Sequence, residues 1–113
     1  MSPADLRKRV RYWKNQLNLR AWTIRLVVIP CKDLPDNHAQ VDYRADHDRA
    51  TIRIRENEPN SEYWLVHELL HLVLAGLRPD HEGYNLLEEM AINRIARALC
   101  KAHKISCPPE SEL

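Results

Sequence analysis

The sequence predicts an α+β domain in which a small, three-stranded and mostly antiparallel sheet packs on a layer of helices. Three observations predict this class: an apolar stripe with helical spacing near the N-terminus, three short β-branched runs after it, and two longer helical patterns towards the C-terminus. The chain has 113 residues, of which 44% are apolar and 29% charged, an ordinary balance for a globular domain. We therefore expect one domain over residues 1–113, with a frayed tail over residues 105–113.

The first expected helix covers residues 3–18. Ser2 is a typical helix cap, and Pro3 suits the first helical position. Apolar residues then recur at spacings of four, three and four, which places on one helical face the side chains of Leu6, Val10, Trp13 and Leu17. The other faces are basic and carry Arg7, Lys8, Arg9, Arg11 and Lys14. This basic side is either a solvated face or a contact for nucleic acid.

Three strands are expected next. Residues 22–30 form a β-branched, apolar run that ends at Pro30, which is typical of a strand. Residues 39–43 and 50–55 alternate between apolar and polar side chains, with a polar turn over residues 46–49 between them. This pattern predicts an antiparallel hairpin.

Two helices complete the domain. The second begins after a cap at Asn60 or Ser61 and ends near Gly76. It is apolar nearly all round, so it belongs in the core. A loop then leads to a third helix over residues 86–104.

The apolar second helix contains the motif His67-Glu68-Leu69-Leu70-His71. Residues four apart on a helix point the same way, so both imidazoles can reach one zinc ion (Zn2+). The glutamate beside the first histidine is the usual general base in this motif. Two imidazoles and a carboxylate are costly in an apolar helix unless something satisfies them, and a bound metal would do so.

A catalytic zinc needs a third protein ligand and one open position for water. We expect Glu88 to form a capping box with Asn85 at the start of the third helix. Glu89 lies on the buried stripe of that helix and is the predicted third ligand, with Asn93 one turn on as a hydrogen-bond partner for a ligand histidine. Glu88 itself and His81 in the preceding loop remain alternatives.

The motif, followed by Glu89-Met90-Ala91-Ile92-Asn93, resembles the H-E-x-x-H…E-x-x-x-(D/N) pattern of the gluzincin metallopeptidases. Over roughly residues 20–100 the chain is similar to small phage-encoded metallopeptidases, and more distantly to the ImmA/IrrE-type peptidases. In the latter an Ala-Asn pair follows the zinc helix, whereas this chain has Ala91-Ile92-Asn93. The resemblance implies a minimal zincin-like domain that acts in the host cytoplasm if the chain is phage-encoded.

The resemblance also implies a chemistry. The chain would be a zinc-dependent metallopeptidase that hydrolyses a protein or peptide substrate, with zinc held by His67, His71 and Glu89. Glu68 would take a proton from the zinc-activated water and pass it to the leaving amine. Tyr84, in the loop before the third helix, is the first candidate for a second electrophile, ahead of His81 and Arg78.

In this class of fold the strand before the zinc helix borders the cleft. Residues 51–55 would then offer their backbone to an extended peptide. Arg53 and Arg55 on this strand are either edge-strand charges that prevent aggregation or charges that make the cleft favour acidic substrates.

Composition excludes several other classes. Three cysteines without a C-x-x-C pair, Cys31, Cys100 and Cys107, argue against a disulfide framework and a cysteine-based zinc site. There is no apolar run long enough to span a membrane and no signal-peptide pattern at the N-terminus, so we expect a cytoplasmic protein. A net charge of +1 gives no global attraction for nucleic acid. The alternative function is a non-catalytic zinc-binding interaction module whose basic first helix contacts nucleic acid.

Overall fold

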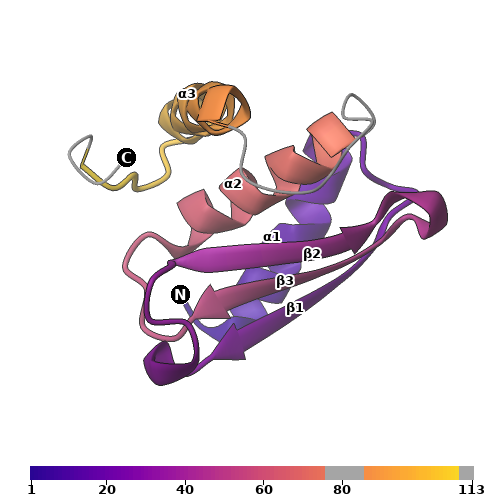
Figure 1. The fold of residues 1–113 in the computed structure, drawn as a ribbon. Coiled ribbons are helices and arrows are strands. Elements are labelled where there is room, and N and C mark those ends of the chain that lie inside the picture. Colours follow the sequence, from indigo (N-terminus) through magenta and orange to yellow (C-terminus); the bar gives the residue numbers. More distant parts are fainter. Residues whose placement is uncertain (76–85, 110–113) are drawn as a thin grey trace.

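Three helices and three strands form the part of the chain that the computed structural model describes, residues 1–75 and 86–109 (Figure 1). The helices are α1 (Pro3–Gln16), α2 (Ser61–Leu74) and α3 (Leu86–Ala102). The strands are β1 (Thr23–Ile29), β2 (Ala39–Arg44) and β3 (Arg49–Arg55), with short 3-10 turns at Cys31–Asp33 and Ala45–His47. The predicted α+β class is confirmed.

The sheet is mixed, with strand order β1-β3-β2. The predicted hairpin is confirmed, because β2 and β3 pair antiparallel from Ala39↔Ile54 to Arg44↔Arg49. The expectation of a mostly antiparallel sheet is wrong, because β1 pairs with β3 in parallel. The reason is the connection over residues 30–38. This connection leads from β1 to the opposite edge of the sheet, where β2 begins. β3 then runs between β1 and β2, antiparallel to β2 and parallel to β1.

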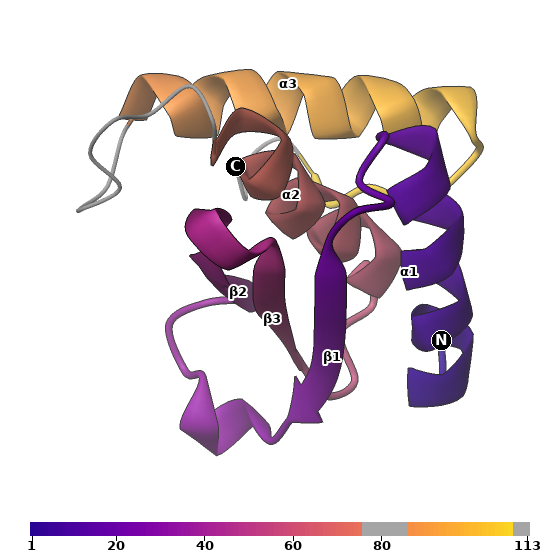
Figure 2. The same ribbon diagram turned by 90° about the vertical axis from the view of Figure 1, so that its right-hand side faces the viewer.

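The helices lie on one face of this sheet, and α2 is at the centre of the molecule (Figures 1 and 2). It packs against α1, β2, β3 and α3. The other face of the sheet is covered by no described helix (Figure 1). None of the described helices has the length and apolarity needed to cross a membrane.

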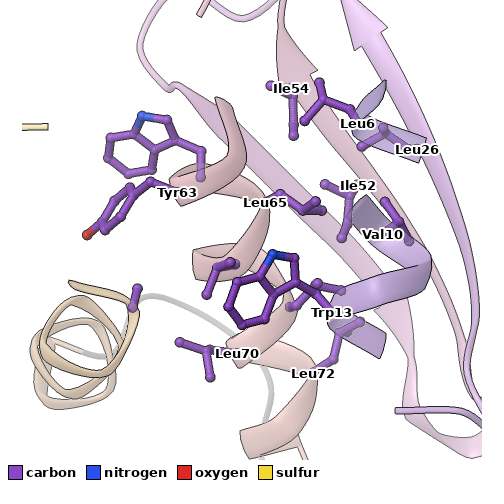
Figure 3. Packing of buried hydrophobic residues seen from close by; sticks show 14 of the residues in the cluster. Leu6, Val10, Trp13, Leu26, Ile52, Ile54, Tyr63, Leu65, Leu70 and Leu72 are labelled. Carbon is purple, nitrogen blue, oxygen red and sulfur yellow. The ribbon is translucent and has the colours of Figure 1, made fainter. Parts of the chain in front are cut away.

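The core forms where α1 and α2 meet the inner face of the sheet (Figure 3). The stripe predicted for the first helix is buried at Leu6, Val10 and Trp13. The alternation of β3 points Ile52 and Ile54 inward, and neither exposes any surface. Along α2 every residue from 61 to 70 is buried, which confirms the prediction of a core helix. Each large apolar side chain buried in this way contributes about 1.5–3 kcal/mol to stability.

A buried carboxylate joins α1 to α2. Glu62, in the first turn of α2, accepts hydrogen bonds from Trp13 Nε1 at 2.7 Å and from Arg9 Nε at 2.6 Å, both at Oε2. The start of α1 is fixed by the predicted cap, because Ser2 Oγ accepts a hydrogen bond from the Asp5 N–H at 3.1 Å. These contacts set the position of α1 along the core helix.

Residues 105–109, the first part of the tail that the sequence predicts to be frayed, contact the rest of the fold. Arg97 Nη2 donates to the Pro108 carbonyl at 2.6 Å, and Pro108 is fully buried. Ser106 Oγ donates to Asn60 Oδ1 at 2.7 Å. Asn60 therefore uses its side chain to hold this segment and makes no side-chain cap bond to α2.

All three cysteines are free thiols, as expected. Burial, together with the neighbouring Cys107 thiol, raises the pKa of Cys100 to about 12. At neutral pH Cys100 is therefore a protonated, unreactive part of the core.

Candidate metal centre

The packing of α3 on α2 brings three predicted ligands together. His67 and His71 lie one turn apart on α2, and Glu89 lies in the first turn of α3. His67 Nε2 is 3.2 Å from Glu89 Oε2, and His71 Nε2 is 2.9 Å from Glu89 Oε1. The ligand atoms of the three residues lie within 4.8 Å of one another, so the group could hold a metal ion.

The group lies at the rim of the core. His67 is 6% exposed, because α2 is buried along this stretch, whereas the Glu89 side chain is 23% exposed. His71 is intermediate, with 16% of its side chain exposed. A metal at this position would have protein on one side and access to water on the other, as a catalytic site requires.

Glu88 supplies a contact that sequence reasoning missed. The Nδ1–H of His71 donates to Glu88 Oε1 at 3.0 Å. Such a bond fixes the imidazole orientation and leaves the other ring nitrogen directed at the ligand position. The expected partner of Glu88, Asn85, lies outside the described residues. The adjacent acids Glu88 and Glu89 are the feature of the sequence that could have predicted this contact. Their side chains leave the helix about 100° apart, so they can reach the two different nitrogens of one imidazole.

The charges of this group are strongly coupled. Burial lowers the pKa of His71, but the hydrogen bonds and negative charges of Glu89, Glu68 and Glu88 outweigh it and raise the pKa to about 9. Hydrogen bonds from His67 and His71 lower the pKa of Glu89 to about 2. Glu89 is thus an anion at neutral pH, the form in which a carboxylate binds a metal.

Glu68 is buried beside the group but is not one of its three ligands. Neighbouring residues on a helix are about 100° apart, so its carboxylate points away from the direction of His67. Burial raises the pKa of Glu68, and the positive charges of His67 and His71 oppose that rise.

Asn93 does not bind a ligand histidine, although the sequence suggested such a bond. Asn93 Oδ1 and His67 Nδ1 are both buried, and neither has a hydrogen-bond partner. An unpaired buried polar atom of this kind costs about 1–3 kcal/mol. The remaining predicted positions, Tyr84, His81 and Arg78, lie outside the described residues.

The donor set fits zinc. Two imidazole nitrogens and one carboxylate are ligands that zinc accepts, and the described residues supply three of the four positions of a tetrahedral site. Of the two histidines, only His71 has the contact at its second ring nitrogen that is usual for a metal-binding histidine, because His67 Nδ1 has no hydrogen-bond partner among the described residues.

The strand expected to bind substrate is not available for that role. β3 is the central strand and pairs with β1 and β2, so residues 51–55 have no free backbone edge. The description of Arg53 and Arg55 as edge-strand charges is wrong for the same reason, and Arg53 instead forms an ion pair with Asp42 of β2.

The edge strand next to the metal centre is β2. His38, just before β2, stacks on Trp64 of α2 with ring centroids 4.3 Å apart and an interplanar angle of 6°. The Trp64 ring in turn lies 5.5 Å from the His67 ring. The start of β2 is therefore connected to the first ligand histidine through one aromatic side chain.

Comparison of the chain with protein-family models, with curated proteins and with solved structures found no match.

Proposed function

We propose that this protein is a zinc-dependent metallopeptidase with a minimal zincin-like architecture. One observation carries the proposal: the ligand atoms of His67, His71 and Glu89 converge within 4.8 Å, and the buried Glu68 directly follows His67 on the same helix. Three protein ligands with an open fourth position are the arrangement of a catalytic zinc, whereas a structural zinc is closed by four.

In this proposal α2 and α3 each have a defined part. His67, His71 and Glu89 hold the ion, and Glu88 orients His71 through the bond to Nδ1. A bound zinc ion supplies Lewis acidity towards the attacking water and the scissile carbonyl. Glu68 accepts a proton from the attacking water and delivers it to the nitrogen of the leaving amine.

The substrate in this proposal is an extended peptide that lies along the free edge of β2. A peptide can extend a sheet only where backbone groups are unpaired, and one edge of β2 is paired with no strand in the part of the chain that the structure describes. The stacking of His38 on Trp64, beside His67, places one end of that edge near the metal centre. This assignment replaces β3, which is paired on both sides.

The test compares Glu68→Gln with the wild type on a library of quenched fluorogenic peptides, after loading with zinc. We expect Glu68→Gln to retain one zinc per chain and to lose about a hundredfold to ten-thousandfold in rate, because only the proton transfer is removed. His67→Ala should lose both zinc and activity. Glu56→Gln, an exposed acid outside the site, is the matched control and should retain both.

Three outcomes count against the proposal. Retention of zinc by His67→Ala would show that the metal lies elsewhere. A wild type that binds zinc and cleaves no peptide would favour a non-catalytic zinc-binding module. A Glu68→Gln variant with the wild-type rate would show that Glu68 is not the general base.

A further inference from the structure

Two shallow hollows, both lined by cations, meet on the surface at Arg25 of β1. One, of about 450 Å³, lies between α1 and β1, and the other, of about 390 Å³, lies over the sheet. β1 lies between α1 and β3 (Figure 2), and Arg25 of β1 lines both hollows. Together they form a basic track, defined by the side chains of Arg7, Arg11, Lys14, Arg25, Arg44 and Arg49.

Secondary structure explains how these cations come together. Arg7, Arg11 and Lys14 recur at i, i+4 and i+7. This spacing places them along one side of α1, with neighbouring residues about one turn, or about 6 Å, apart. Arg25 points away from the core, because its neighbours on β1 point inward. β2 pairs with β3, and this pairing puts Arg44 of β2 directly opposite Arg49 of β3.

The track is largely uncompensated. Among residues 1–75 and 86–109 no carboxylate forms an ion pair with Arg7, Arg11, Lys14, Arg25 or Arg49. One acid, Asp42, lines the track, and it is paired with Arg53. Arg44 has one partner, the exposed Asp46 at 3.9 Å. Arg44 and Arg49 are like charges directly opposite each other, an arrangement that destabilises a sheet. In a chain whose net charge is only +1, this segregation of cations points to an anionic partner.

We propose that the basic track binds the sugar–phosphate backbone of nucleic acid. Guanidinium groups match phosphate oxygens in pairs, and the hydroxyls of Thr23 and Thr51 in the same hollow can donate to them as well. A shallow, open surface suits a continuous charged backbone. The track involves the uncovered sheet face and α1, whereas the metal centre lies between α2 and α3, so both sites can be occupied at once. The proposal does not depend on peptidase activity.

The test is fluorescence anisotropy with the full-length, zinc-loaded chain and labelled single-stranded and duplex DNA of mixed sequence. We expect binding at low salt that weakens steeply as salt rises, because phosphate contacts release counterions. Arg25→Glu, at the junction of the hollows, should weaken binding by about tenfold or more and reduce the salt slope. Arg11→Glu should weaken binding in the same way and provides an independent check from α1.

The matched control is Arg94→Glu, which makes the same charge change at an exposed position of α3 and should alter affinity by about twofold or less. Circular dichroism and zinc content verify that each variant is folded. The proposal is overturned if the wild type does not bind either DNA at low salt, or if Arg94→Glu is as damaging as Arg25→Glu. It is also overturned if poly-glutamate of equal charge displaces the DNA as well as unlabelled DNA does, because the partner would then be an acidic polypeptide.

Discussion

At the scale of single residues, Glu88 and Glu89 show how adjacent side chains take different roles. Glu89 lies between the Nε2 atoms of His67 and His71, and Glu88 binds Nδ1 of His71 from the other side. Helical geometry separates them by about 100°, so a single turn of α3 provides both a candidate metal ligand and a group that orients the candidate ligand His71. In both residues the function depends on α3 being held against α2.

This division of roles predicts different effects of truncation on zinc affinity. Glu89→Ala should weaken zinc binding by roughly a hundredfold to a thousandfold, since the roughly 10–16 kcal/mol of a four-ligand structural zinc site amounts to about 2.5–4 kcal/mol per ligand. Glu88→Ala should weaken it by only about tenfold to a hundredfold. Titration against a zinc indicator measures both, and Glu56→Ala should leave the affinity unchanged. Equal losses for Glu88→Ala and Glu89→Ala would show that Glu88 is itself a ligand.

At the scale of secondary structure elements, α1 is attached to α2 by apolar packing and by one polar contact. Trp13 is completely buried, and its indole N–H has the Glu62 carboxylate as its acceptor. Arg9 binds the same oxygen atom from a more exposed position, with 32% of its side chain accessible. The buried bond therefore contributes more to the attachment than the ion pair at the surface.

Glu62→Ala should lower the free energy of unfolding by about 2–3 kcal/mol, because it leaves the Trp13 indole N–H buried without a partner. Arg9→Ala should cost less, about 1 kcal/mol, since 32% of the Arg9 side chain is accessible to water and the Glu62 carboxylate keeps Trp13 Nε1 as a donor. Urea denaturation monitored by tryptophan fluorescence measures both changes. If the two variants are equally stable, the buried hydrogen bond is not what attaches α1.

At the scale of the whole molecule, α3 packs on α2 through Ile92, Ala96 and Cys100 and makes polar contacts near each of its ends. Near its start Glu88 and Glu89 contact the histidines of α2, and beyond its end residues 105–109 pack against the core. A metal held by His67, His71 and Glu89 would link α2 and α3 across residues 76–85. Metal binding and the stability of the fold should therefore be coupled.

Zinc should raise the thermal unfolding temperature, and a chelator should reverse the rise. At free zinc a hundredfold above the dissociation constant, the added stability is about 2.7 kcal/mol. Thermal denaturation followed by circular dichroism measures this shift. His67→Ala should not respond to zinc, whereas Glu68→Gln should respond like the wild type; a full response from His67→Ala would place the stabilising metal elsewhere.

Much of the fold and of the candidate site could be predicted from local sequence patterns. The spacing of Leu6, Val10 and Trp13 determined the buried face of α1, and the alternation around a short polar turn determined the β2–β3 hairpin. The four-residue spacing of His67 and His71 placed both imidazoles on one side of α2. These features were predictable because each depends on helical or strand periodicity within a few residues.

Only the tertiary structure decided which distant segments meet. It placed β3 between β1 and β2, which removed residues 51–55 from substrate binding and left β2 as the edge strand beside the metal centre. It also brought Glu88 to His71 and joined the cations of α1 to those of the sheet through Arg25. Local periodicity fixes the direction in which a side chain points from its own helix or strand. The partner that it meets there depends on how the whole chain buries its apolar faces, and that is set by contacts between residues far apart in the sequence.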